Sequence, residues 1–157
     1  MANQMRRASL PSSELEAEPR TQPQLDARAL SELPPFETMD LDEISALLKL
    51  ATSYRVRRDG LLFEEDTVAT HIYMLVHGYA RMARTTTDGE QVVLAHVGPG
   101  ELFGLAPVLA AEAYSASVKM VADGVVLAWP SDRWQEMFEA HPGFFRACQK
   151  SLGARVY

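Results

Sequence analysis

The stretch that decides the fold is Gly98-Pro99-Gly100-Glu101-Leu102-Phe103-Gly104. Three glycines and one proline within seven residues exclude a regular helix or a full strand, because glycine permits positive φ angles and proline lacks an N–H donor. Leu102 and Phe103 supply apolar side chains that would hold such a turn against a core. The stretch therefore predicts a tight turn, which serves either as a ligand cradle or as a glycine-bearing corner of a β-structure.

Short β-prone runs lie on both sides of this turn. The runs are Tyr54–Arg57, Leu61–Phe63, Ile72–Val76, Tyr79–Thr85, Gln91–Val97, Ser117–Val121 and Val125–Trp129. Besides the central turn, the separators are Asp59-Gly60, His77-Gly78, Asp88-Gly89 and Asp123-Gly124. Strands that recur at this spacing with glycine-bearing turns predict a sandwich or barrel, and Asp88-Gly89 is the clearest hairpin.

Helical spacing flanks the β-prone region. Asp40 and Glu43 form a capping-box pattern, and the apolar spacing that follows predicts an amphipathic helix over 41–51. After the last strand, Ser131 is the predicted N-cap of a second helix, and Pro142 fits the first turn of a third.

The third helix carries an apolar stripe that predicts a dimer seam. The stripe consists of Phe145, Cys148, Leu152 and Val156.

The N-terminal part of the chain has a different composition. Residues 1–35 hold five of the nine prolines and few aliphatic residues, which predicts a flexible arm with at most a short helix near Leu25–Leu33. We expect the folded domain to span residues 36–142, and residues 143–157 to begin a longer helix.

The composition excludes several classes of function. The 157 residues are 47% hydrophobic and carry a net charge of −6, which is ordinary for a globular domain and gives no general attraction to polyanions. We therefore expect no nucleic-acid contact by this segment. Cys148 is the only cysteine, which excludes an internal disulfide and a zinc ribbon. Since no apolar run could span a bilayer and no signal peptide is apparent, we expect a cytoplasmic protein without membrane contact.

The order of elements resembles the sensor domain of the CRP/FNR family of bacterial transcription regulators, from roughly Phe36 to Val156. The Gly100–Gly104 turn, followed by an insert and Ser115-Ala116, is similar to the phosphate-binding cassette of the cyclic-nucleotide-binding domain. The resemblance implies a mainly β fold with flanking helices, a double-stranded β-helix of jelly-roll type that continues into a C-terminal dimerisation helix. It also implies a ligand pocket lined by Gly100, Glu101, Leu102, Phe103, Gly104, Leu105, Tyr114, Ser115 and Ala116.

Two cassette positions depart from the cyclic-nucleotide pattern. Leu105 stands where the family has a glutamate for the ribose, and Tyr114 stands where it has an arginine for the cyclic phosphate. Loss of one buried charge partner costs about 2–5 kcal/mol of affinity. We therefore expect that the domain does not respond to cAMP or cGMP, although a cyclic-nucleotide-binding module is the alternative.

Within the family, the cassette and the stretch Val126–Ser131 resemble the DNR/NnrR-like regulators, which respond to nitric oxide and control nitrate respiration and denitrification. This resemblance implies haem as a cofactor. Among the candidate axial ligands, His96 lies on the strand that leads into the cassette and is expected nearest the pocket. The candidates are His71, His77, His96, His141, Cys148 and the methionines. Each of them can also be explained as an ordinary structural residue.

Other functional classes remain as alternatives. A cupin-like metal enzyme needs a His-x-His pair, which the sequence lacks, so we do not expect an enzyme. A domain that only dimerises is a third alternative. The favoured interpretation is an effector-sensing domain of a homodimeric regulator, with a small-molecule or gas effector. Its DNA contact would be made through a helix-turn-helix domain that this sequence does not contain.

Overall fold

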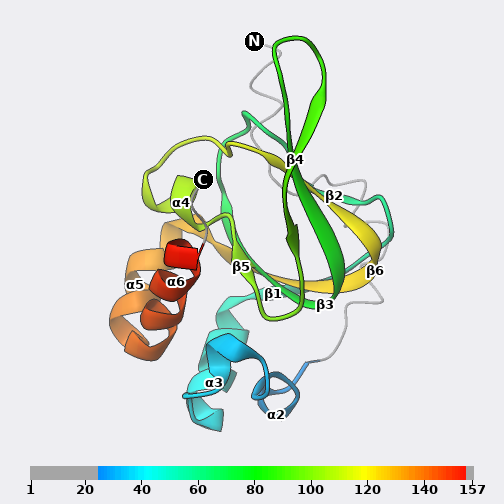
Figure 1. The fold of residues 1–157 in the computed structure, drawn as a ribbon. Coiled ribbons are helices and arrows are strands. Elements are labelled where there is room, and N and C mark those ends of the chain that lie inside the picture. Colours follow the sequence, from blue (N-terminus) through cyan, green and yellow to red (C-terminus); the bar gives the residue numbers. More distant parts are fainter. Residues whose placement is uncertain (1–24, 155–157) are drawn as a thin grey trace.

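The computed structural model describes residues 25–154, which form an antiparallel sheet rolled around an apolar core, with helices along one side (Figure 1). The strands of this region are β1 (Thr52–Val56), β2 (Leu61–Phe63), β3 (His71–Thr85), β4 (Gln91–Val97), β5 (Leu102–Phe103) and β6 (Ser117–Pro130). The helices are α2 (Ala27–Leu30), η3 (Pro34–Phe36), α3 (Leu41–Leu50), α4 (Leu105–Leu109), η4 (Ser131–Arg133), α5 (Trp134–Ala140) and α6 (Pro142–Ala154). The predicted class, mainly β with flanking helices, is confirmed.

Two long strands, β3 and β6, form the frame of the roll, and each one merges two of the predicted runs. His77-Gly78 and Asp123-Gly124 were expected to be turns, but they are bends inside continuous strands where the pairing register shifts. A Cβ atom at Gly78 would lie 2.8 Å from the Asp123 carbonyl oxygen, and one at Gly124 would overlap the His77 carbonyl. The two glycines therefore let β3 and β6 approach each other closely while they stay paired.

The hairpin between β3 and β4 forms where Asp88-Gly89 predicts it. Gly89 has a φ of +86°, its N–H donates to the Thr86 carbonyl at 2.9 Å, and the Thr86 N–H donates to the Glu90 carbonyl at 2.7 Å. The hairpin projects beyond the rest of the roll (Figure 1). Its base therefore belongs to the domain wall, whereas its tip is free of the core.

The core holds most of the large aromatic side chains. The indole N–H of Trp129 on β6 donates to the Leu47 carbonyl at 2.9 Å, which joins the sheet to α3. Phe144 of α6 packs against Trp129 with ring centroids 5.1 Å apart. One buried cluster thus fixes helices from both ends of the chain on the roll.

The helix starts follow the sequence only in part. The Asp40 carboxylate accepts a hydrogen bond from the Glu43 N–H at 2.8 Å, as an N-cap should, and α3 ends one residue before the predicted limit. Ser131 is not an N-cap, because its own N–H donates to the Thr70 carbonyl at 2.7 Å and residues 131–133 form η4. This bond keeps Ser131 at the end of the sheet, and α5 begins only at Trp134.

The folded part begins earlier than the predicted boundary at residue 36. The short helix expected near Leu25–Leu33 is present as α2, whose Leu30 is fully buried, and Pro35 of η3 is also buried. These apolar side chains attach residues 25–35 to the domain. The rest of the predicted arm lies outside the described residues.

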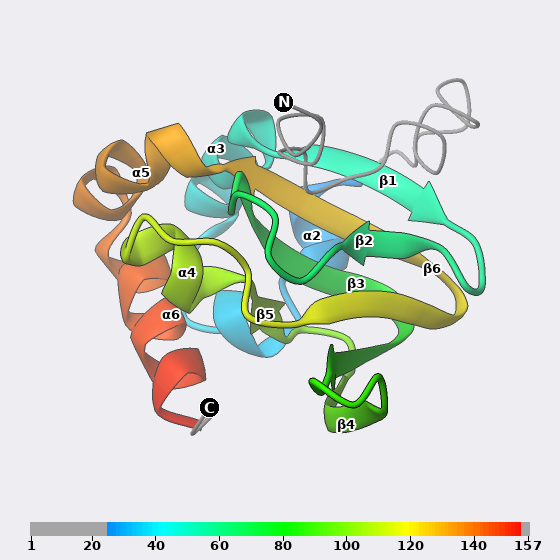
Figure 2. The same cartoon turned by 90° about the horizontal axis from the view of Figure 1, so that it is seen from above.

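The predicted dimer stripe on α6 is divided. Cys148 is 1% exposed and packs in the core of its own domain, because α6 uses Phe144 and Cys148 to dock on the roll. Phe145 is 38% exposed, and Val156 lies outside the described residues. Figure 2 shows α6 beside α4, at the cassette end of the roll. Within the described residues, no helix is long and apolar enough to cross a membrane.

Candidate ligand-binding site

The cassette turn is held by backbone bonds to β3. The Gly100 N–H donates to the Leu75 carbonyl at 2.7 Å, and the Leu75 N–H donates to the Glu101 carbonyl at 3.1 Å. Gly100 and Gly104 have φ values of +85° and +78°, which L side chains rarely adopt. The Glu101 carboxylate accepts from the Gly98 N–H at 2.5 Å, so it closes the turn from which it comes.

A cavity of about 280 Å³, called here the cassette cavity, lies beneath this turn. Seven of the nine predicted pocket residues line it, whereas Gly100 and Glu101 line a neighbouring pocket. The seven are Leu102, Phe103, Gly104, Leu105, Tyr114, Ser115 and Ala116. The structure therefore brings seven of the predicted residues to one cavity and places Gly100 and Glu101 in the wall of another.

Tyr114 is part of the cavity wall rather than a donor toward a ligand. Its hydroxyl donates to the His71 carbonyl at 2.7 Å and accepts from the His71 N–H at 3.0 Å. Its ring stacks on Phe63 with centroids 3.8 Å apart, and the residue is 1% exposed. The hydroxyl is therefore engaged by backbone, and it does not replace the phosphate-binding arginine of the family pattern.

Several wall residues were missed by sequence reasoning. They are Phe63, Met82, Arg84, Leu94, Ala106, Pro107, Ser151 and, as a cavity residue, Leu152. Met82 and Arg84 are two positions apart on β3, so strand alternation could have placed both on one face. Leu152 was assigned to the dimer seam, but it faces the cavity because α6 packs across the cassette.

A second pocket of about 560 Å³ lies between η3, the cassette turn, β4 and α6. His96 lines this second pocket and not the cassette cavity, which corrects its expected position. The His96 ring is exposed and stacks on Tyr79 with centroids 5.9 Å apart. Glu101 of the cassette and two cations of α6, Arg146 and Lys150, line the same pocket.

The remaining titratable candidates are separated in space. Burial lowers the pKa of His71, against the opposing charge of Asp132, and the Nδ1 of His71 lies 2.9 Å from the Thr70 hydroxyl. His141 Nδ1 lies 3.6 Å from a Glu43 carboxylate oxygen. Burial raises the pKa of Cys148 to about 12, which makes the thiol unreactive.

These groups do not form a metal centre. Across residues 25–154, no three His, Cys, Asp or Glu side chains are grouped closely enough to hold a metal ion. A cupin-like site therefore has no ligand set within the described part of the chain.

Known proteins with a similar sequence or fold include several transcription regulators. Residues 54–141 match the cyclic nucleotide-binding domain family. The chain is 36% identical over 59 residues to the transcriptional activatory protein AadR of Rhodopseudomonas palustris. The aligned region covers 38% of this chain and 25% of AadR. It is also 36% identical over 83 residues to the cyclic AMP receptor protein of Thermus thermophilus, which covers 50% of this chain and 38% of that protein.

A solved structure agrees with the sequence matches. The crystal structure of the Thermus thermophilus catabolite activator protein superimposes with a TM-score of 0.70 at 25% identity, over 77% of this chain and 57% of that chain. The chain thus spans well under two thirds of the regulators that it matches. With a family match over residues 54–141 and this jelly-roll fold, the chain belongs to the cyclic nucleotide-binding domain family, as found in CRP-type regulators.

Proposed function

We propose that this chain is the effector-sensing domain of a CRP/FNR-type transcription regulator, and that its effector binds in the cassette cavity. Family membership supports the general role, since AadR is named an activatory protein and the Thermus relative a receptor protein. DNA binding would belong to another part of the regulator, because this segment carries a net charge of −6.

The observation that carries the proposal is the position of α6 in the cavity wall. The Ser151 hydroxyl donates to the Leu102 carbonyl at 3.2 Å, and Leu152 lines the cavity directly. A ligand that binds more tightly to one position of these two side chains shifts the docking equilibrium of α6 toward that position. The shift in free energy equals the difference in the ligand's affinity for the two positions. The helix would then transmit the change to a second protomer, with Phe145 as its exposed apolar contact.

The effector we favour is not a cyclic nucleotide. The Tyr114 hydroxyl is engaged by His71, Leu105 supplies no acceptor for a ribose, and the cassette contributes no side-chain cation to the wall. The family match supports cAMP or cGMP equally as a candidate.

Calorimetric titration with cAMP and cGMP at millimolar concentration separates the two possibilities. We expect no saturable heat. A one-to-one isotherm that is lost in Leu105→Trp, which would fill the cavity, would establish the cyclic-nucleotide alternative.

A specific observation supports a second candidate function, haem-based nitric oxide sensing of the DNR/NnrR type. The second pocket holds an exposed imidazole, His96, and two cations, Arg146 and Lys150, on one concave surface. Imidazole is a common axial ligand of haem, and cations pair with carboxylates such as propionates. The cassette cavity offers neither a histidine nor a cysteine, so the second pocket suits haem better. Bound haem would supply a site for a diatomic gas.

A haemin titration tests this second candidate. We expect a saturable one-to-one Soret shift that responds to nitric oxide after reduction and weakens in His96→Ala. His77→Ala is the matched control, because His77 is exposed on β3 and does not line the second pocket. A spectrum that stays that of free haemin, or equal weakening in both variants, would contradict haem binding at His96.

A further inference from the structure

We infer that the cassette cavity takes a small organic monoanion with an apolar body, and that Arg84 pairs with its anionic group. This inference rests on the proposed function, because it specifies the effector class of the same cavity. Fifteen described residues line the cavity, and among them only Arg84 carries a formal charge. In a protein of net charge −6, one cation on an otherwise uncharged wall selects for the sign of the ligand.

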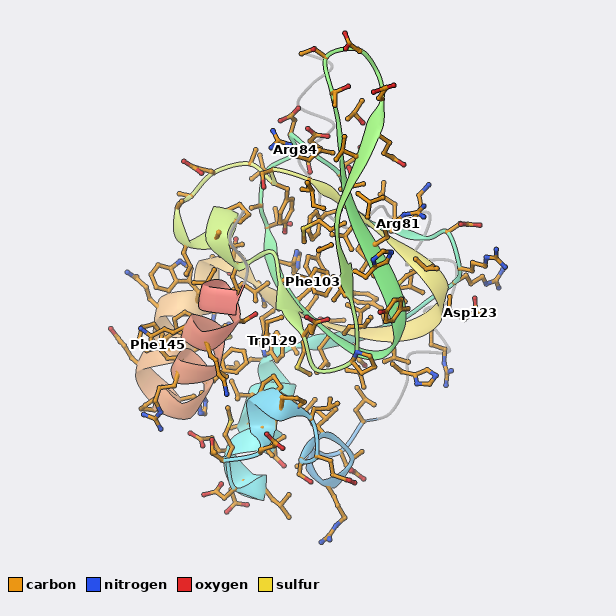
Figure 3. All side chains as sticks on the ribbon, viewed as in Figure 1. Arg81, Arg84, Phe103, Asp123, Trp129 and Phe145 are labelled. Atoms are coloured by element: carbon orange, nitrogen blue, oxygen red, sulfur yellow. The ribbon has the colours of Figure 1, made fainter. Side chains whose placement is uncertain are left out.

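Arg84 is placed to serve a ligand. It follows Met82 on the inner face of β3, opposite Val92 of β4, and it lies nearer the tip of the hairpin than Phe103 does (Figure 3). Within the described residues, the Arg84 side chain forms no ion pair or side-chain hydrogen bond. The neighbouring Glu65 carboxylate accepts instead from the Thr85 N–H at 3.0 Å. Arg84 is exposed, so the donors of its guanidinium face solvent and are accessible to a bound group.

The cassette end of the cavity offers no cationic side chain to an anion. Pro107, in the first turn of α4, has no N–H, and Leu105 is 3% exposed and apolar. The Tyr114 hydroxyl is engaged by the His71 backbone. The anionic group of the ligand should therefore lie toward the β3–β4 hairpin, and its apolar body toward Phe103 and Leu105.

The volume and the single cation narrow the ligand class. A cavity of about 280 Å³ lies at the lower limit of the range of roughly 300–1,000 Å³ that small-molecule sites occupy. One guanidinium binds one carboxylate in a bidentate, charge-assisted arrangement, whereas a second charge on the ligand would have no partner. A short carboxylic acid satisfies both limits.

Binding of hexanoate and of its neutral analogue hexanamide, followed by amide NMR on the chain, tests the inference. Arg84→Gln should weaken hexanoate binding by about tenfold and leave hexanamide unchanged. Arg81→Gln is the matched control, because Arg81 lies on the same strand but does not line the cavity. Benzoate and benzamide repeat the comparison with a planar body.

The outcomes separate this inference from the proposed function. If hexanoate and hexanamide bind equally, or if Arg84→Gln changes neither, the cavity binds small molecules but the monoanion inference is wrong. If neither acid shifts cavity amides, the inference is also wrong, and the effector role of the cavity then depends on the cAMP and cGMP titrations. If Arg84→Gln loses hexanoate binding and Arg81→Gln keeps it, the result supports both the monoanion inference and the proposed function.

Discussion

The cassette cavity and the second pocket share two wall residues, Leu102 and Ser151, but they differ in chemistry. The cassette cavity is lined by buried core side chains such as Phe103 and Tyr114, with one cation. The second pocket is larger and carries an imidazole, two carboxylates and two cations on exposed positions. Side chains of the cassette cavity therefore also hold the domain together, whereas the charged side chains of the second pocket lie at exposed positions.

The backbone of the cassette turn and the chemistry of its wall rest on different residues. Gly100 and Gly104 are required by the backbone, because their positive φ values and close contacts fix the turn on β3. Leu105 and Tyr114 are compatible with the same backbone, and they stand where the cyclic-nucleotide pattern has a glutamate and an arginine. The shape of the turn and the identity of its ligand are therefore set by different residues.

The largest expected effect is on stability, from Tyr114→Ala. Removal of the ring opens a cavity beside Phe63 and leaves the His71 backbone groups without their partner, which should cost about 3–5 kcal/mol of unfolding free energy. His96→Ala in the second pocket should change the unfolding free energy by less than about 0.5 kcal/mol, because the ring is exposed. Urea unfolding measures both, and equal losses would contradict the contrast between the two sites.

A glycine pair isolates the packing of the cassette turn. Gly100→Ala places a Cβ 2.6 Å from Pro34 Cδ at a φ of +85°. Gly89→Ala carries the same backbone strain, because its φ is +86°, but its Cβ would meet no neighbouring atom within 4 Å. The φ cost is about 1–2 kcal/mol at either position, so Gly100→Ala should lose more unfolding free energy than Gly89→Ala. If the two variants were equally stable, the turn would not be held against η3.

The coupling of α6 to the cassette can be followed with the single thiol. Cys148 is buried and its pKa is raised to about 12, so native labelling by a disulfide reagent should require α6 to undock. Ser151→Ala removes the bond to the Leu102 carbonyl, worth about 0.5–1.5 kcal/mol, and should accelerate labelling by several-fold. Gln149→Ala, on the exposed side of α6, is the control and should label at the original rate.

The smallest expected effect is a pH dependence from His71, whose pKa burial lowers below 6.5. The unfolded chain then binds the proton more tightly than the folded chain, so stability is complete above pH 6.5 and falls as the pH drops toward the lowered folded value. His71→Gln should flatten this slope in urea unfolding at a series of pH values. An unchanged slope would assign the pH dependence to other groups.

The sequence predicted the backbone better than the chemistry of the site. Capping at Asp40, the Asp88-Gly89 hairpin and the start of α6 at Pro142 are local signals, and the structure confirms each of them. The bends at Gly78 and Gly124 depend on the close approach of two strands that are far apart in sequence, which no local pattern records.

Some positions in the site differ from their prediction for a similar reason. The partner of the Tyr114 hydroxyl is 43 residues away along the chain. His96 has the right position in sequence to reach the cassette cavity, but it lines the second pocket instead. Arg84 gave no motif signal at all, because only the fold brings it to the cavity wall.

The most direct test of the central claim, that a ligand in the cassette cavity acts on α6, is an amide NMR titration of the chain with hexanoate. The account predicts that the amides of Gly104 and Ser115 shift together with those of Ser151 and Leu152, with one common dissociation constant. Shifts confined to the cassette, with α6 unchanged, would contradict the coupling. Shifts grouped around His96 and Lys150 would place the effector in the second pocket and contradict the account.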